Sequence, residues 1–473
     1  MFRKYAPKMW FYISLSPVLF FAGLLSYAVT SNLFGMLLGF SIFYIFTLIY
    51  SIKQTGFTSL YSIYLYTSAF FIYNSLFLSL FPNFTKKYFL KITYPWPYQI
   101  EEWVGFIFII CCFLMVFCGH LSYFSFRRKF NPILVSYRKK NWEWIGIRFF
   151  FVSLIPVCYK IYLQLQFVRT NGYFSIYSEG FESIKYPIWC SGAFLFFNAS
   201  FFLLLASNPK RRKMLFYFFI YFIVTVFNSL KGGRGPLIAF IVVLIFLLRN
   251  KYDYSIKFKN LLFVLFLIVF LTSVLGSIRD SYGNSSHKTK GISLDAKTLI
   301  INTLWSQTSS RTVPLLIIRG NLKYHPYPFI FYPFTNRVLS HIYKAKGNEF
   351  ESLKNYNNPS QVLMGNISVS SALSGMGYGS AIIGEAYECG RYFGVVVFSI
   401  LASCLIAFLD KSKLKMKNFY IPFWYVVLTT VPGIPRKEIF QFVLYNLNDV
   451  VFFYIFFFII NFLFFRITLR NEK

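Results

Sequence analysis

The sequence is poor in charged residues, and in acidic ones most of all. Its 473 residues include only 16 Asp and Glu against 48 Lys and Arg, and 14% of the chain is charged, whereas soluble globular domains have about 25%. Hydrophobic residues make up 56% of the chain and recur in runs of about twenty, the length of a membrane-spanning helix. This composition excludes a secreted or cytosolic enzyme and a β-barrel. It predicts an all-α polytopic integral membrane protein.

Other chemical signals are missing as well. The sequence has no Gly-rich phosphate-binding loop followed by Lys-Ser/Thr, which argues against an ATP-driven transporter and against an enzyme that uses a nucleotide-activated donor. Its four histidines and seven cysteines show no metal-ligand spacing, so we expect neither a metal nor a cofactor. A net charge of +32 would suggest nucleic acid as the partner of a soluble chain. In a membrane chain we attribute it to topology and expect no nucleic-acid partner.

The apolar runs predict about twelve transmembrane helices in a single membrane domain that covers residues 1–473. The candidate spans are 9–29, 33–51, 59–81, 103–124, 143–165, 187–207, 214–230, 236–248, 260–278, 391–410, 418–432 and 449–466. Basic clusters precede the first span and follow the fourth, sixth, eighth and tenth, so they all fall on one face. Because Lys and Arg collect in cytoplasmic loops, both termini are predicted to be cytoplasmic.

The segment between the ninth and tenth spans is the longest on the predicted outer face. Residues 279–390 are polar and rich in aromatic residues, and they contain no apolar run long enough to span a membrane. Long loops in compact domains are usually functional. We therefore expect a large outer loop region with a functional role.

Two arginines stand in short turns on the outer face, where positive charge should be rare. Arg234 lies in the turn Lys231-Gly-Gly-Arg-Gly-Pro236, beside the N-terminus of the next helix, whose dipole favours an anion. Arg436 lies in the last outer loop, where it follows two prolines and precedes Lys437. Guanidinium groups match phosphate oxygens bidentately, so both residues are candidates for binding a pyrophosphate. A solvated Gly-rich turn and contact of Arg436 with lipid headgroups are the alternatives.

The long outer segment adds two more arginines to this set. Arg311 follows Gln-Thr-Ser-Ser, and these small hydroxyl neighbours are expected to leave its guanidinium accessible. Arg279 directly follows the ninth span and precedes Asp280, so a local pair with that residue or a lipid contact is an equal alternative to substrate binding. Several outward arginines with few outward carboxylates predict a cavity for a polyanion.

Glu385 is the first candidate for a catalytic base. It lies in the Gly- and Ser-rich stretch 365–394, near an apolar boundary where ionisable groups are costly and often functional. Its carboxylate could accept a proton from a sugar hydroxyl or pair with Arg391 or another arginine. Close helix packing accounts for the small residues of this stretch equally well. Asp280 is the second candidate for the base.

Four features combine in the later part of the chain. They are the segment KGGRGPLIAFIVVLIFLLRN, the large outer loop after the ninth span, the run GYGSAIIGEAYECGRYFGVVVFSIL and the late IPRKEIFQF. Together, over roughly residues 160–466, they resemble the Wzy-type O-antigen polymerases. The resemblance implies a GT-C-type glycosyltransferase fold with a large periplasmic loop, in a multi-pass protein of the bacterial inner membrane.

The resemblance also implies a reaction. The enzyme would polymerise undecaprenyl-pyrophosphate-linked oligosaccharide repeat units on the periplasmic face, without a metal and with inversion at the anomeric carbon. Arg234, Arg311 and Arg436 would neutralise the leaving pyrophosphate, whereas the family pattern offers no universally fixed base. The product would be O-antigen or capsular polysaccharide. The implied partners are the lipid-linked oligosaccharides, the lipid bilayer and a chain-length regulator protein.

An O-antigen ligase and a flippase for lipid-linked oligosaccharides are the alternatives. Ligases carry an outer-loop His followed by Asn, Ser or Gln, and none of His287, His325 and His341 has such a neighbour. Flippases have short loops and two similar halves, whereas this chain has a long outer segment and no internal repeat. Both observations favour the polymerase.

Overall fold

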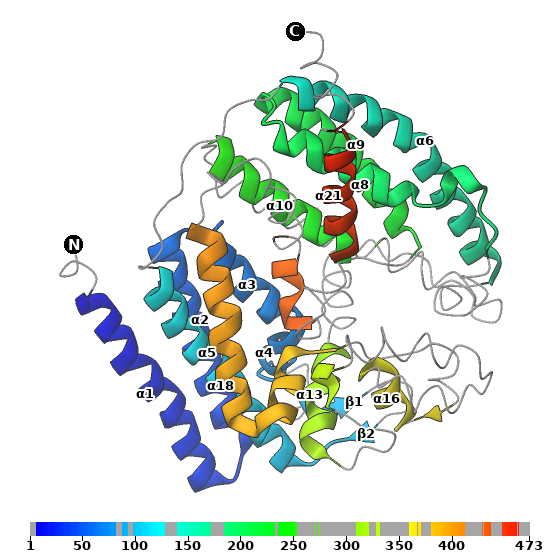
Figure 1. The fold of residues 1–473 in the computed structure, drawn as a ribbon. Helices are drawn as coiled ribbons and strands as arrows, with labels where there is room; N and C mark the ends of the chain where they lie inside the picture. Colours follow the sequence, from blue (N-terminus) through cyan, green and yellow to red (C-terminus); the bar gives the residue numbers. More distant parts are fainter. Residues whose placement is uncertain are drawn as a thin grey trace. The chain divides into compact units, whose positions relative to one another are not determined.

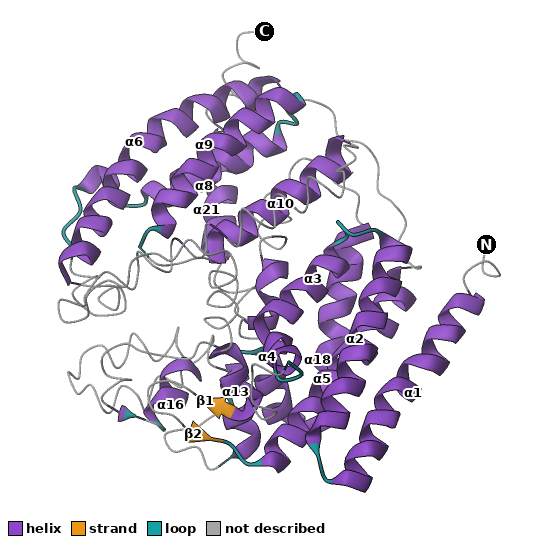
Figure 2. Ribbon diagram, turned by 180° about the vertical axis from the view of Figure 1, so that it is seen from behind, coloured by secondary structure: helices purple, strands orange, loops and turns teal. Residues whose placement is uncertain are grey.

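The computed structural model describes most of the predicted membrane segments and parts of the long outer segment. The described ranges are 6–81, 88–92, 98–127, 140–171, 184–231, 235–252, 309–320, 328–331, 359–366, 380–411, 430–436 and 447–460, with a few single positions besides. Regular structure in these ranges is almost entirely helical (Figures 1 and 2). The strands β1 (Lys91–Ile92) and β2 (Tyr98–Gln99) form one short antiparallel ladder, in which Lys91 lies opposite Gln99.

Five helices of the described ranges are long and apolar enough to cross a membrane. They are Leu33–Thr55, Glu102–Arg127, Asn141–Asn171, Ile188–Ala206 and Ile382–Asp410. A helix satisfies its own backbone hydrogen bonds, which is why it can cross lipid. The prediction of a polytopic helical membrane protein is therefore confirmed, while the number of twelve spans and the GT-C fold stay predictions.

Helices also occupy further predicted spans. Their bounds are α1 Ala6–Thr30, α2 Leu33–Thr55, α3 Leu60–Ser68, the π-helix η2 Ala69–Tyr73, α4 Asn74–Leu78, α5 Glu102–Arg127, α6 Lys140–Asn171, the 3-10 turn η5 Ile188–Cys190, α8 Ala193–Ala206, α9 Arg211–Ser229, α10 Gly235–Tyr252, α18 Ile382–Lys411 and α21 Leu447–Ile460. The predicted spans 260–278 and 418–432 lie almost wholly outside the described residues.

The chain divides into two compact units. Unit 1 contains residues 1–130, 301–410 and 432–440, and unit 2 contains residues 131–300, 411–431 and 441–473. Unit 1 therefore holds α1–α5 and α18, together with short elements from the later part of the chain. Unit 2 holds α6, α8, α9, α10 and α21. That residues 1–473 form a single membrane domain stays a prediction.

Close helix contact and stacked rings build the core of unit 1. At the crossing of α1 and α2, a Cβ added to Gly23 would lie only 2.6 Å from the carbonyl oxygen of Gly35. Small residues permit this approach of two backbones, which is typical of membrane helices. Nearby, Phe20 stacks on Phe113 of α5 with ring centroids 4.0 Å apart. Close packing thus joins α1, α2 and α5, and a buried hydrogen bond between hydroxyl groups of α1 and α2 adds to it.

Aromatic side chains fill unit 2 between α6, α8 and α9. Phe150 of α6 stacks on Phe197 of α8 with centroids 4.8 Å apart. Phe201 of α8 stacks on Tyr221 of α9 at 4.4 Å. Offset ring pairs of this kind contribute about 0.5–1.5 kcal/mol each beyond their buried area. They fix α8 between its two neighbours.

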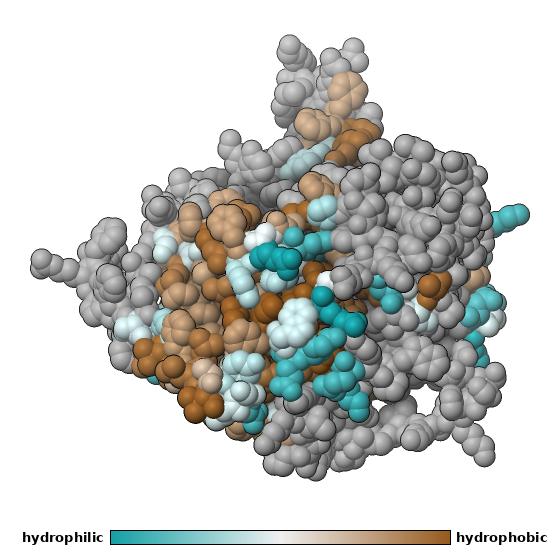
Figure 3. Space-filling view, turned by 90° about the horizontal axis from the view of Figure 1, so that it is seen from below, coloured by the Kyte–Doolittle hydropathy of each residue, from teal (hydrophilic) through white to brown (hydrophobic). Residues whose placement is uncertain are grey.

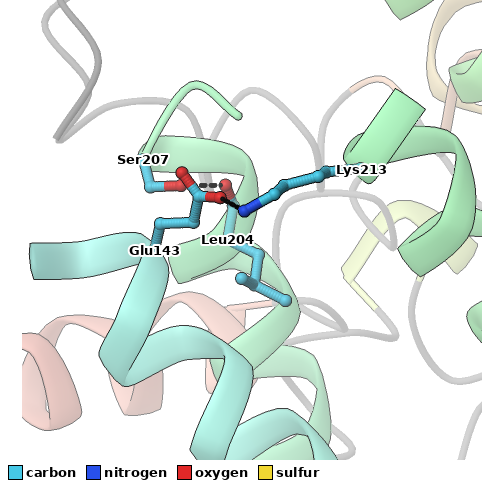
Figure 4. Close-up of polar contacts among 4 residues, drawn as sticks. All are labelled: Glu143, Leu204, Ser207 and Lys213. Atoms are coloured by element: carbon cyan, nitrogen blue, oxygen red, sulfur yellow. Dashed lines mark hydrogen bonds and ion pairs between the residues drawn. The ribbon is translucent and has the colours of Figure 1, made fainter. Parts of the chain in front are cut away.

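An ion pair joins α6 to α9 at one end of unit 2. The Nζ of Lys213 lies 2.9 Å from Glu143 Oε1 (Figure 4), and the glutamate side chain is only 4% exposed. Beside it, the Ser207 hydroxyl donates to the Leu204 carbonyl oxygen at 2.7 Å at the end of α8. Glu143 lies in the first turn of α6 and Lys213 in the first turn of α9. Both helices therefore begin at this end, which is the predicted cytoplasmic one.

Candidate active site

The helix α13 (Ser309–Arg319) brings part of the long outer segment into the core of unit 1. It contacts α5, η2 and the short helix α16 (Pro359–Gly365). A Cβ added to Gly384 would lie 3.1 Å from the Cα of Pro314, so the first turn of α18 touches the middle of α13. Only a glycine allows two helices to approach this closely without displacement.

Arg311 is buried in this junction. It is 2% exposed, and its Nη2 donates to the backbone oxygen of Lys91 in β1 at 2.7 Å. The prediction of an accessible guanidinium is wrong, because Ser310 and Thr312 are themselves buried in the packing of α13. A guanidinium keeps its charge when buried, and charges act more strongly at low dielectric. Arg311 therefore places a permanent positive charge in this junction.

Glu385 lies in the first turn of α18, next to the contact with α13. It is 0% exposed, and its Oε1 accepts a hydrogen bond from the Ser380 hydroxyl. The N-terminus of a helix stabilises negative charge, which suits a carboxylate there. The hydrogen bond from Ser380 was not predicted from the sequence, although the serine-rich stretch before α18 was the available signal.

The first part of α18 is a separate helical segment, because the helix is interrupted at Gly390 and Arg391. Both residues have non-helical dihedral angles, and Arg391 adopts a positive φ of 53°, which is rare for a residue with a side chain. Its Nη1 donates to the Tyr387 hydroxyl at 3.1 Å. Before this break, Glu388 Oε2 accepts from the backbone N–H of Phe329 in the 3-10 turn η6 (Phe329–Phe331) at 2.9 Å. Interrupted helices often line binding sites in membrane proteins.

Arg436 reaches the same unit from the end of the chain. It ends the 3-10 helix η8 (Val431–Arg436), and its guanidinium carbon lies 5.7 Å from the centroid of the Phe71 ring. Phe71 belongs to η2, which also contacts α13. The structure therefore brings the elements that carry Arg311, Glu385 and Arg436 together in unit 1.

Polar side chains gather at the end of unit 1 where α13, β1 and β2 lie. Seen from that end, hydrophilic residues lie beside the apolar surface (Figure 3). Arg319, the last residue of α13, places its Nε 3.3 Å from Glu101 Oε1, and both side chains are exposed. Such exposed pairs add little stability. They do indicate a surface that faces water rather than lipid.

Three candidates fall outside the described residues: Arg234, Arg279 and Asp280. The helix predicted after Arg234 is confirmed, because α10 begins at Gly235.

The comparison with protein families covers nearly the whole chain. The family described as O-antigen polysaccharide polymerase Wzy matches residues 9–468. The chain belongs to this family. No curated protein and no solved structure matches it. The match includes the first four spans, which the resemblance over roughly residues 160–466 had left out.

Membership in the Wzy family defines the class of activity. The protein is a glycosyltransferase-type polymerase of O-antigen repeat units, and it acts on lipid-linked oligosaccharides in a membrane. Together with its apolar helices, this makes it a multi-pass protein of the inner membrane.

Proposed function

We propose that this member of the Wzy family polymerises undecaprenyl-pyrophosphate-linked repeat units on the periplasmic face of the inner membrane. The growing chain would move from its carrier to the non-reducing end of a new lipid-linked unit. The observation that supports this most is the gathering of Arg311, Glu385 and Arg436 about α13 and η2 in unit 1. Two permanent cations and one carboxylate are the groups that such a transfer requires.

The reaction exchanges one carbon–oxygen bond for another. A hydroxyl oxygen of the incoming unit attacks the anomeric carbon of the growing chain, and the bond from that carbon to the pyrophosphate breaks. The bonding electrons leave with undecaprenyl pyrophosphate, and the hydroxyl proton passes to a base. Attack opposite to the leaving group inverts the anomeric carbon. No metal is invoked in this scheme.

The arginines would stabilise the charge that develops on the leaving group. Arg436 lies on the Phe71 ring at the end of a proline-fixed loop, so its guanidinium is oriented before substrate binds. Arg311 would add a second charge from within α13. Preorganised donors aimed at developing charge are usually the largest catalytic term. Arg234 and Arg279 are further candidates for contact with the pyrophosphate.

Glu385 would accept the proton. It lies beside the α13 contact, and the Ser380 hydroxyl orients its carboxylate. A buried carboxylate can accept the proton only if the substrate hydroxyl reaches it, so binding would have to open this junction. Asp280 is the second choice for the base.

The proposed orientation places both termini in the cytoplasm and the active site in the periplasm. The positive-inside rule supports it, because the Glu143–Lys213 end of unit 2 adjoins the basic run Lys210–Lys213. A chain-length regulator protein would act on the product from the periplasmic side.

Purified full-length protein and a defined lipid-linked repeat unit test the proposal directly. We expect a ladder of lipid-linked oligomers, and linkage analysis should find the anomeric centre inverted. Transfer of sugar to lipid A core would instead identify a ligase, and transbilayer movement without new glycosidic bonds would identify a flippase. Either result would overturn the proposal.

A further inference from the structure

Two lysines share one aromatic ring in unit 2. Lys160 lies in α6, and Lys231 follows the end of α9. Their Nζ atoms both lie 6.0 Å from the centroid of the Phe194 ring. The Nζ of Lys160 is also 4.7 Å from the centroid of Tyr186. The two ammonium groups therefore converge on the start of α8 from two different helices.

A hydrogen-bond chain fixes this arrangement. Lys231 Nζ donates to Gln164 Oε1 at 2.5 Å, and Gln164 Nε2 donates to the Tyr186 hydroxyl at 3.0 Å. Gln164 is buried in α6, so its amide has little freedom to turn. Connected polar groups of this kind hold one another in place. The lysine cluster, defined as Lys160, Gln164, Tyr186, Phe194 and Lys231, is thus an organised site.

The lysine cluster carries positive charge without a matching carboxylate in the described ranges. The ion pairs found there involve Glu143 and Glu101, which belong to other places in the fold. Burial and the neighbouring Lys160 lower the pKa of Lys231 to about 8. Holding two ammonium groups together in a partly buried place is costly. A bound anion would remove that cost.

The position of the cluster corresponds to a membrane interface. Along α6, Glu143 and Gln164 are separated by about 31 Å at about 1.5 Å per residue. Along α9 and its following turn, Lys213 and Lys231 are separated by about 27 Å on the same measure. The hydrocarbon core of a bilayer is about 30 Å thick. The two bonds that join these helices therefore lie one bilayer thickness apart.

Exposed aromatic residues surround the cluster at this level. Trp189 of η5 stacks on Tyr159 of α6 with ring centroids 5.1 Å apart, and both rings are exposed. Tyr162, almost one turn after Tyr159 along α6, is exposed as well, and Ile188 is 91% exposed. Trp and Tyr collect at the headgroup level of membranes. The lysine cluster thus adjoins a surface suited to lipid.

We propose that Lys160 and Lys231 bind the phosphate headgroup of a lipid, either a polyprenyl diphosphate or an anionic phospholipid. The ammonium groups would contact the phosphate oxygens, and the acyl or prenyl chain would lie along Ile188 and Trp189. Both lysines belong to unit 2, whereas Arg311 and Arg436 belong to unit 1. Its assignment to the outer leaflet rests on the proposed orientation.

Lipid binding to the full-length protein in phosphatidylcholine nanodiscs tests the site. Undecaprenyl diphosphate and phosphatidylglycerol are titrated in separate arms, which tells the two sources apart. Lys160→Gln and Lys231→Gln should each weaken binding of the preferred lipid about tenfold, as expected for one charged hydrogen bond. The matched control is Lys185→Gln, which removes an exposed lysine beside Tyr186 and should leave the affinity unchanged. Equal affinity in all variants, or an equal loss in the control, would overturn the proposal.

A measurement on the unmodified lysines keeps the test valid if a glutamine variant does not fold. Lys231 faces Lys160, Gln164 and Phe194. With a pKa of about 8 it loses its charge as the pH rises from 7 to 9. If only the protonated form binds, affinity should fall about tenfold over this range. Lys231→Arg should bind without this fall, because guanidinium stays charged. An identical pH profile in both proteins would exclude Lys231 from the site. Since no turnover is measured, either outcome leaves the proposed polymerisation untouched.

Discussion

Replacement of Arg436 by alanine separates catalysis from folding more cleanly than any other change at the active site. The side chain lies over the Phe71 ring at 5.7 Å and is only half-buried. A cation–π contact at such a site is worth about 0.5–1 kcal/mol. Loss of this contact should therefore leave the folded protein abundant in the membrane.

The expected effect on catalysis is much larger. Removal of one preorganised group that stabilises developing negative charge costs about 2.7–4 kcal/mol, or a factor of about 100–1000 in kcat. Arg436→Lys should restore activity only in part, because an ammonium group cannot form the planar two-bond contact with phosphate oxygens. The predicted loss of rate thus exceeds the predicted loss of stability by several kcal/mol.

The assay is the banding ladder of lipopolysaccharide in a strain that lacks its own polymerase, measured together with the amount of protein in the membrane. Arg436→Ala should reduce the ladder to a single repeat unit at normal abundance. The control is Arg319→Ala, which removes an exposed arginine paired with Glu101 and should leave the ladder complete. A full ladder with Arg436→Ala would refute the role of this guanidinium at the pyrophosphate.

Three further predictions concern other parts of the structure. Glu385→Gln should lower kcat about 100- to 10000-fold in the purified enzyme if the carboxylate is the base, and a normal rate would assign the base elsewhere. Gly384→Ala should reduce the ladder with little loss of protein, because the new methyl group presses on the backbone of Pro314; a complete ladder would show that the α13 contact does not position the site. Lys213→Met should lower the thermal unfolding temperature, because the Glu143 carboxylate stays buried without its lysine. The free energy of unfolding should fall by about 1–2 kcal/mol, less than for a fully buried pair, because Lys213 is 52% exposed. An unchanged unfolding temperature would contradict this prediction.

Hydropathy predicts the membrane helices well because lipid leaves the backbone no alternative partner. Residues 59–81 are predicted as one span, and Leu60–Leu78 within them is continuous helix through the π-helical turn η2. The span expected at 391–410 begins where α18 is interrupted, at Arg391. The helical segment before that break was missed because its glycines and glutamates are typical of a loop.

The geometry of the sites was harder to predict, since it depends on contacts between distant segments. The hydroxyl neighbours of Arg311 suggested exposure, but α13 buries them against helices from elsewhere in the chain. The lysine cluster combines Lys160, Tyr186 and Lys231 from three separate segments. Each residue alone looks like an interfacial lysine or tyrosine, and only the fold brings them together.

The two basic sites differ in a way that suits the two lipid-linked substrates of a polymerase. Guanidinium groups give directed, bidentate contacts, which matter most where charge grows on a leaving pyrophosphate. Ammonium groups act as point charges with less geometric demand, which is sufficient for a phosphate that stays bonded to its lipid throughout. Binding that is equal in the ground and transition states lowers KM without raising kcat. On this reasoning the lysine cluster would help to hold a lipid at the membrane surface, whereas the arginines of unit 1 would lower the barrier to transfer.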